Sequence, residues 1–189
     1  RKFPKSRPFK LLFFGRILPY KGLDILLDAY HYCSEHNKNL ELEVWGAGDI
    51  TKYENIINKL DGLKIFNRWI NEEEFPSIFE ANDLLILPYK EASQSGVVCT
   101  AQAYGMPTVI SPIPGLCEQI EHDVDGYVID SLNYKDLADG IEYIISNPDK
   151  YEYYSTNSIE KAKNELSWDQ IGLKIINSAR TLNKLGKRI

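Results

Sequence analysis

Arg16 and Lys21 lie in the segment GRILPYKG, residues 15–22, just after an apolar stretch. A guanidinium can hold a phosphate through two parallel hydrogen bonds, and an ammonium adds a point charge, so this pair suits a pyrophosphate. Basic residues are also common in surface loops, where water alone solvates them. The segment therefore predicts an anion site, with two solvated surface cations as the alternative.

A second segment, residues 87–114, joins an apolar strand to a helix through a loop with Glu91, Ser95 and Gly96. The first N–H groups of the helix that Val97 begins have no partner within it and attract anions. Gly96 would let a phosphate approach the backbone closely, while Ser95 reads as an ordinary helix N-cap with or without that role. Glu91 is placed to accept hydrogen bonds from sugar hydroxyls, and a plain surface carboxylate is the equal alternative.

Signals for a metal or a further ligand are weaker. Gly46 and Gly48 follow an apolar strand and could admit a ligand against bare backbone, but two glycines alone more often form a plain turn. Asp123 and Asp125 form an Asp-x-Asp pattern that resembles a metal-binding motif, but the sequence HDVDGYVI favours a polar turn before a strand. Three scattered histidines and three cysteines without C-x-x-C spacing indicate neither a metal site nor a disulfide framework. We expect no metal and no cofactor.

Strands and helices that would position these groups alternate along the chain. Short apolar runs of the kind that is buried on both faces predict strands at 10–14, 40–45, 63–66, 84–87, 108–110 and 127–129. Apolar residues at helical spacing predict helices after Gly22, over 72–81, 97–104 and 137–145, then over 149–165 and from 167 onward.

This alternation predicts an α/β fold with a doubly wound, Rossmann-like sheet of about six parallel strands. Helices are expected on both faces, with extra C-terminal helices beyond the sheet. Such a sheet keeps its ligand at the carboxyl ends of the strands, where both anion-binding segments fall.

Size and charge limit the remaining function classes. The 189 residues suit a single domain, 1–189, and a net charge of −5 argues against nonspecific nucleic-acid binding. Basic residues gather only at the two ends, as solvated tails or as contacts to an anionic membrane surface or an adjoining domain. Without a bilayer-spanning run or a disulfide pattern, the chain is expected to be cytoplasmic, at the inner face of the membrane if its ends bind lipid, and a piece of a longer protein.

The motifs and their order resemble a known family. FFGRILPYKG, VWGAG, IFNRWINEEEFPSIFEANDLLILP and AYGMPTVIS follow one another as in the C-terminal, nucleotide-sugar-binding domain of retaining GT-B-fold glycosyltransferases, family 4 (group 1), and the likeness covers residues 11–168. It implies that Arg16, Lys21 and Glu91 are catalytic, with the two cations on the donor diphosphate. It implies donor-binding roles for Gly15, Gly46, Gly48, Arg68, Trp69, Ile70, Ser95, Gly96, Val97 and Thr100.

The likeness also implies partners. The donor would be a nucleotide diphosphate sugar, and a glycan or lipid-linked glycan acceptor would be held by an N-terminal domain that is missing here. The chain alone should then bind donor and transfer little or nothing. Surface-polysaccharide assembly is the commonest bacterial use of the family.

One departure concerns the family's paired carboxylates, Glu-x7-Glu. Alignment on AYGMP puts Ala92 and Thr100 at those places, with Glu91 one residue early, so Glu91 serves the first role only in a shifted loop. Thr100 offers the ribose one hydrogen bond, weaker than a charge-assisted one. A noncatalytic nucleotide-sugar-binding partner subunit therefore remains the alternative function.

Two other functions fit less well. A dinucleotide-dependent dehydrogenase needs a glycine-rich fingerprint after the first strand, which Gly15-Arg16-Ile17 does not supply. A signalling receiver domain would want acidic residues where Phe13, Phe14 and Phe66 stand.

Overall fold

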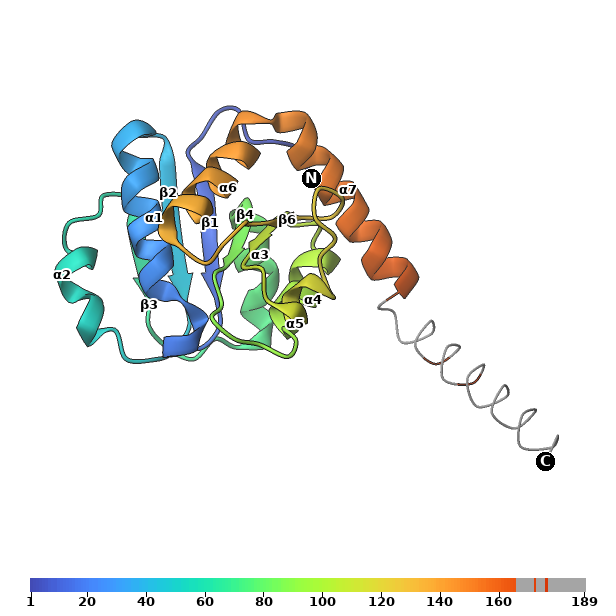
Figure 1. Cartoon of the computed structure of the whole chain (residues 1–189), viewed down its shortest axis with the longest axis horizontal. Coiled ribbons are helices and arrows are strands. Elements are labelled where there is room, and N and C mark those ends of the chain that lie inside the picture. The colour runs from blue at the N-terminus through green and yellow to red at the C-terminus, as the bar shows by residue number, and fades with distance from the viewer. Residues whose placement is uncertain (166–171, 173–175, 177–189) are drawn as a thin grey trace.

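Six parallel strands form one sheet in the computed structural model, which describes residues 1–165, 172 and 176. Their order across the sheet is β3-β2-β1-β4-β5-β6 (Figure 1). The strands are β1 (Phe9–Phe14), β2 (Leu40–Trp45), β3 (Leu63–Phe66), β4 (Leu84–Leu87), β5 (Thr108–Ile110) and β6 (Tyr127–Val128). All six predicted strands are confirmed, although β1 begins one residue earlier than expected and β6 ends one residue earlier.

Helices follow the strands in the predicted alternation. They are α1 (Leu23–His36), α2 (Glu54–Ile57), α3 (Phe75–Ala81), α4 (Gly96–Ala103), α5 (Pro114–Cys117), α6 (Tyr134–Ser146) and α7 (Pro148–Glu165), with 3-10 turns η1 (Pro19–Lys21), η2 (Thr51–Tyr53) and η3 (Glu72–Glu74). The helix expected over 72–81 is divided into η3 and α3, whereas the one expected from residue 167 onward lies outside the described residues.

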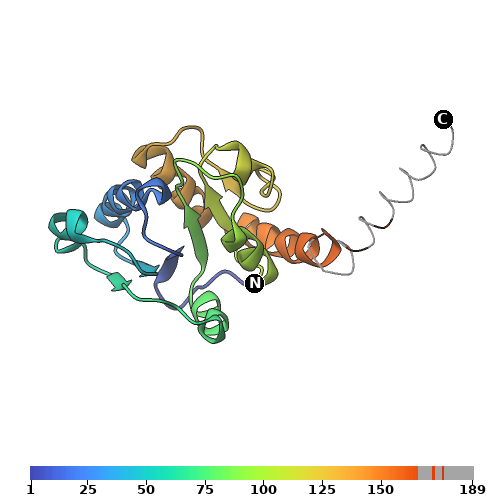
Figure 2. The ribbon, with the colours of Figure 1, turned by 90° about the horizontal axis from the view of Figure 1, so that it is seen from below.

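Side chains of the central strands alternate between two hydrophobic clusters. Leu11 and Phe13 of β1 point to the face that α1 and α6 cover, and Leu12 and Phe14 point to the face of α3 and α4. Helices on both sides of the sheet are visible in Figure 2. Because successive strand residues face opposite ways, a strand covered on both faces must be apolar throughout, which is why these runs were readable in the sequence.

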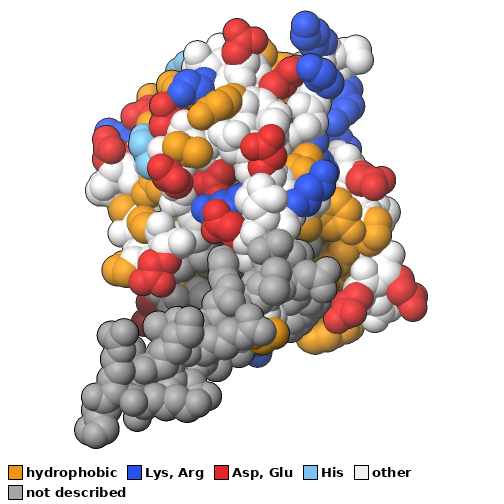
Figure 3. Space-filling model, turned by 90° about the vertical axis from the view of Figure 1, so that its right-hand side faces the viewer, with side chains coloured by type: hydrophobic (Ala, Val, Ile, Leu, Met, Phe, Trp, Pro, Cys, Tyr) orange, Lys and Arg blue, Asp and Glu red, His pale blue; other side chains and the backbone are white. Residues whose placement is uncertain are grey.

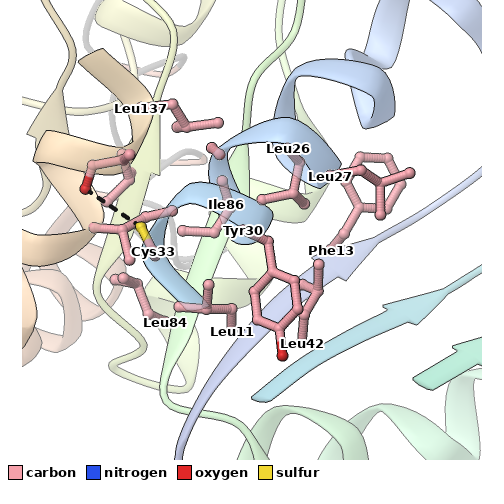
Figure 4. Close-up of a cluster of buried hydrophobic side chains, with 14 of the residues drawn as sticks. Leu11, Phe13, Leu26, Leu27, Tyr30, Cys33, Leu42, Leu84, Ile86 and Leu137 are labelled. Carbon is pink, nitrogen blue, oxygen red and sulfur yellow. Dashed lines mark hydrogen bonds between the residues drawn. The ribbon is translucent and has the colours of Figure 1, made fainter. Parts of the chain in front are cut away.

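The apolar stripe predicted for α1 is the centre of the larger cluster (Figure 4). Leu26, Leu27 and Tyr30 are fully buried against the strands, and the Tyr30 hydroxyl donates to the Asp61 carbonyl oxygen at 2.7 Å. Burying each such leucine contributes about 2 kcal/mol, so α1 is fixed firmly on the sheet. Burial also raises the pKa of the Cys33 thiol to about 12, so this thiol stays protonated.

Helix α7 continues past the sheet and packs on α4, burying Tyr154, Ser155 and Ser158. Figure 3 shows both acidic and basic side chains on this side of the molecule, with several Lys and Arg side chains along its upper right edge. In the described part of the chain, we find no helix with the length and hydropathy needed to cross a bilayer.

Candidate functional site

The centre of the sheet contains a topological switch point. Strands β1 and β4 pair with each other, but the helix after β1 covers one face and the helix after β4 covers the other. The loops that leave the two strands therefore diverge and leave a crevice at the carboxyl edge, where doubly wound sheets bind ligands.

Two adjoining cavities occupy this crevice and share Phe14 and Phe75 as walls. The Lys21 cavity has a volume of about 860 Å³, and the predicted site residues on its wall are Lys21, Glu91, Ser95, Gly96, Val97 and Thr100. The Arg68 cavity has a volume of about 470 Å³, and those on its wall are Gly15, Arg16, Gly46, Arg68, Trp69 and Ile70. All the predicted site residues except Gly48 thus lie in one of the two cavities.

Lys21 is held in place by an aromatic side chain that the sequence analysis did not single out. Its ammonium Nζ donates a hydrogen bond of 2.6 Å to the Tyr89 hydroxyl and lies 4.0 Å from the centre of that ring. Burial, and then the positive charge of Arg16, lower the pKa of Lys21 to about 8. Burial likewise raises the pKa of Tyr89 to about 12, so the phenol stays neutral and leaves the lysine charge uncompensated.

The two anion-binding segments meet at Gly15. A Cβ atom placed on Gly15 would lie 3.7 Å from Lys21 Nζ and 3.8 Å from Val97 Cγ2 at the start of α4. Arg16 follows directly in the chain, is exposed, and lines the adjoining cavity. The lysine and the helix start therefore line one cavity of the crevice, and the arginine lines the adjoining one.

A tight turn keeps Lys21 in this position. Gly22 has φ 70°, and a Cβ there would lie 1.9 Å from the Pro88 carbonyl oxygen, so only glycine lets η1 press against the loop after β4. The Lys90 amide also donates to the Tyr20 carbonyl oxygen at 2.7 Å. The loop after β1 is thus fastened to the loop after β4.

The start of α4 is open to solvent. Gly96 is exposed, and a Cβ there would meet nothing within 4 Å. Thr100 donates from Oγ1 to the Gly96 carbonyl oxygen at 3.0 Å, which leaves its lone pairs free to accept. Glu91 lies exposed at the rim of the Lys21 cavity.

The N-cap prediction for Ser95 is wrong in its chemistry. Ser95 occupies the N-cap position, but its hydroxyl makes no capping hydrogen bond, and the residue is only 5% exposed. The side-chain amide of Gln119 holds the Ser95 backbone instead. No sequence signal could find Gln119, because it lies 24 residues from Ser95 on another loop.

The Arg68 cavity is walled by a fixed ion pair and an exposed ring. The Arg68 guanidinium binds both carboxylate oxygens of Glu74, and this contact lowers the pKa of Glu74 to about 2. Trp69 is 73% exposed beside it. Asn71 caps the 3-10 turn η3 and forms a capping box with Glu74. An exposed indole next to a fixed guanidinium offers a flat ligand two surfaces for stacking.

Gly46 and Gly48 have packing roles that the sequence did not reveal. A Cβ on Gly46, whose φ is 147°, would lie 1.9 Å from the Gly15 carbonyl oxygen, and one on Gly48 would lie 2.2 Å from that of Ile17. Both glycines therefore let the loops after β1 and β2 touch. Gly46 still lines a cavity, but Gly48 lines neither, so its direct contact with a ligand is not supported.

Asp123 and Asp125 are bound by side chains of their own chain. Lys150 pairs with Asp123 and Lys161 with the buried Asp125, each at 2.6 Å. In the residues that the structure describes, no group of acidic, histidine or cysteine side chains is arranged to hold a metal ion. The three cysteines are free thiols.

The sheet, the switch point and the paired cavities define a doubly wound α/β protein with a ligand site at its carboxyl edge. The family model described as "Glycosyl transferases group 1" matches residues 1–161, and the chain belongs to that family.

Relatives and solved structures agree with this assignment. An uncharacterized glycosyltransferase of Methanocaldococcus jannaschii is 28% identical over 171 residues, covering 88% of this chain and 43% of the relative. One of Haemophilus influenzae is 28% identical over 166 residues, covering 82% and 46%. The chain thus spans about half the length of these curated relatives.

Among solved structures, the C-terminal domain of a group 1 glycosyl transferase from Francisella tularensis superposes with a TM-score of 0.77, covering 86% of this chain and 89% of that one, at 16% identity. Anabaena HepE in complex with UDP-glucose gives a TM-score of 0.80, covering 93% and 50%, at 22% identity. At these identities the superpositions establish the shared fold.

Proposed function

We propose that this chain is the donor-binding part of a retaining, hexosyl-transferring glycosyltransferase. It would bind a nucleotide diphosphate sugar, and a glycan or lipid-linked glycan acceptor would be held by a domain outside this chain. The convergence of Lys21, Arg16 and the start of α4 around Gly15 carries the proposal. Surface-polysaccharide assembly on the cytoplasmic side of a membrane is the setting that we propose.

The chemistry follows from where charge develops. Breaking the bond between the sugar and the nucleotide leaves negative charge on the departing phosphate. Lys21, the neighbouring Arg16 and the free N–H groups of α4 are positive groups that would stabilise this charge, and we expect the reaction to need no metal. Glu91, at the rim of the same cavity, is placed for the sugar hydroxyls.

Ligands bound to structural neighbours support the choice of donor. One neighbour is described in complex with UDP-glucose and another with UDP and α-GlcNAc-glycerol. In our proposal the nucleoside lies in the Arg68 cavity, against Trp69 and Ile70, and the diphosphate and sugar lie in the Lys21 cavity. The shared walls Phe14 and Phe75 would then lie along the bound donor.

A noncatalytic partner subunit that only binds nucleotide sugars is the second candidate. It is favoured by Thr100, whose hydroxyl donates to the Gly96 carbonyl oxygen where the family pattern has a carboxylate. The two candidates differ in whether the complete protein consumes its donor. Release of nucleoside diphosphate that depends on acceptor supports the enzyme, and donor binding without release supports the subunit.

A thermal-shift panel of nucleoside diphosphates and their sugars tests donor binding by this chain. A true donor at 100 times its dissociation constant adds about 2.7 kcal/mol to the free energy of unfolding, which raises the melting temperature by several degrees. NAD serves as the control ligand. A response to NAD alone, or to no member of the panel, contradicts the proposal.

Gly96→Ala separates ligand contact from folding. Because the added methyl group meets open space, we expect the free energy of unfolding to stay within about 0.5 kcal/mol. The same methyl group would obstruct a phosphate at the start of α4, so affinity for UDP should fall about tenfold, as expected for the loss of one charge-assisted contact. Calorimetric titration measures the affinity, and unchanged UDP binding would remove Gly96 from the site.

A further inference from the structure

Gln119 lies on the turn after α5, and its side-chain amide forms two hydrogen bonds with the backbone of Ser95, the residue before α4. The Ser95 N–H donates to Gln119 Oε1 at 2.7 Å, and Gln119 Nε2 donates to the Ser95 carbonyl oxygen at 3.1 Å. One planar amide thus occupies both polar groups of a single buried residue. The two hydrogen bonds resemble those between one pair of residues on adjacent β-strands. They fix the position and the orientation of the Ser95 backbone.

The backbone of Gln119 is itself anchored by two polar side chains, and a buried carboxylate holds both of them. Its carbonyl oxygen accepts hydrogen bonds from Gln102 Nε2 at 2.9 Å and from Lys161 Nζ of α7 at 2.8 Å. Both donors also bind the buried carboxylate of Asp125. The amide that holds Ser95 is therefore connected to α4 and α7 and cannot move independently of them.

Among the described residues, the Gln119 amide is the side chain that bonds the Ser95 backbone, and the Val98 N–H of α4 adds a backbone hydrogen bond to the Ser95 carbonyl oxygen. The Ser95 hydroxyl makes no capping hydrogen bond. The next residue, Gly96, is exposed and has open space where a side chain would be. The orientation of the free N–H groups at the start of α4 then depends on the Ser95 peptide and on the side chain that holds it.

We propose that Gln119 is a positioning residue that fixes the start of α4 for the diphosphate of the donor. The proposal rests on the proposed function, because it assigns to Gln119 the alignment of a group that this function uses. Gln119 acts through Ser95 and does not touch the nucleoside. Its loss should therefore weaken contacts to phosphate and leave contacts in the Arg68 cavity unchanged.

The experiment compares Gln119→Leu, which keeps the volume and loses both hydrogen bonds, with Gln119→Glu, which keeps the acceptor and loses the donor. Calorimetric titration of each variant with UDP and with uridine separates the phosphate contacts from the nucleoside contacts. Asn157→Leu is the matched control, because it removes a hydrogen bond to the Val124 carbonyl oxygen in the same region without touching Ser95.

We expect Gln119→Leu to weaken UDP binding about tenfold, with Gln119→Glu between it and the wild type, because two hydrogen bonds position the peptide. Uridine affinity should stay constant in both, and Asn157→Leu should bind both ligands as the wild type does. In the unliganded chain, hydrogen exchange of the Ser95 amide should accelerate in Gln119→Leu and not in Asn157→Leu.

Three results would overturn the inference. Equal losses of affinity for UDP and uridine would indicate a general structural defect. Unchanged UDP affinity in Gln119→Leu would show that the hydrogen bonds between Gln119 and Ser95 do not align the site. An unchanged hydrogen-exchange rate of the Ser95 amide in Gln119→Leu would show that Gln119 does not hold the Ser95 backbone. A wild-type chain that bound no nucleoside diphosphate of the thermal-shift panel would contradict the proposed function, which is a different failure from these three.

Discussion

Turnover should fall by about two orders of magnitude or more when either Lys21 or Arg16 is replaced by alanine in a complete enzyme that contains this chain. Each residue provides a positive charge at the crevice beside Gly15, where the diphosphate would lie. Removing one preorganised group that stabilises a developing charge typically raises the barrier by about 3 kcal/mol. Steady-state turnover with saturating donor and acceptor measures the effect.

Replacement of Lys21 should lower turnover but should not lower the stability of the unliganded chain. Its lowered pKa means that the folded chain holds an ammonium where burial disfavours the charge. Lys21→Met removes that cost and keeps the aliphatic stem, so the unliganded chain should unfold at an equal or higher temperature while binding UDP poorly. A residue whose removal harms binding and not folding is retained for function.

Lys90→Met is the matched control for these variants. Lys90 follows β4 as Lys21 follows β1, but its ammonium is exposed, pairs with Asp24 at 2.6 Å and lines neither cavity. Exposed pairs contribute little, so this change should alter neither turnover nor UDP affinity. Equal losses of turnover and UDP affinity in Lys90→Met and Lys21→Met would mean that Lys21 acts only through long-range attraction by net charge.

The fold could be predicted from the sequence because the central strands of the sheet are buried on both faces. Strands such as β4, whose four residues are all buried, must be continuously apolar, and that pattern survives in a single sequence. The 3.6-residue spacing of Leu23, Leu26 and Leu27 identified α1 for the same reason. The order of the elements then placed both anion-binding segments at one edge of the sheet.

Features that depend on contacts between distant segments could not be predicted. Residue 46 must be glycine because the carbonyl oxygen of Gly15, 31 positions earlier, lies where a side chain would be. From the sequence alone, Gly46 indicates a place where a ligand could approach the backbone, or a plain turn. Tyr89 holds Lys21 across 68 positions, and the clamp by Gln119 joins two loops. Local sequence patterns report local structure, and these contacts are decided by tertiary packing.

Affinity for a nucleoside diphosphate should be near its maximum at pH 7, be about halved at pH 8, and then fall by up to about tenfold per pH unit. In the free chain Lys21 loses its proton as the pH rises through about 8. A bound diphosphate adds negative charge beside the ammonium and raises the pKa of Lys21, so binding above pH 8 must take up a proton. Near pH 8.5 the uptake should be about three-quarters of a proton per ligand.

Titration calorimetry in two buffers with different ionisation enthalpies measures this uptake directly. Lys21→Arg is the control, because a guanidinium does not titrate in this range and should give neither the uptake nor the decline. Wild-type affinity that stays level to pH 9.5 would mean that Lys21 does not meet the phosphates.

The unliganded chain should show the reverse trend with pH, because its Lys21 pKa is lowered to about 8 from an ordinary value of 10.5. Between these values the unfolded chain binds more protons at this residue than the folded one, so the contribution of Lys21 to stability rises with pH. Relative to Lys21→Met, the wild-type melting temperature should therefore increase from pH 8 to 9.5 while UDP affinity decreases. One buried ammonium accounts for both opposed slopes, whereas general alkaline damage would lower stability and affinity together.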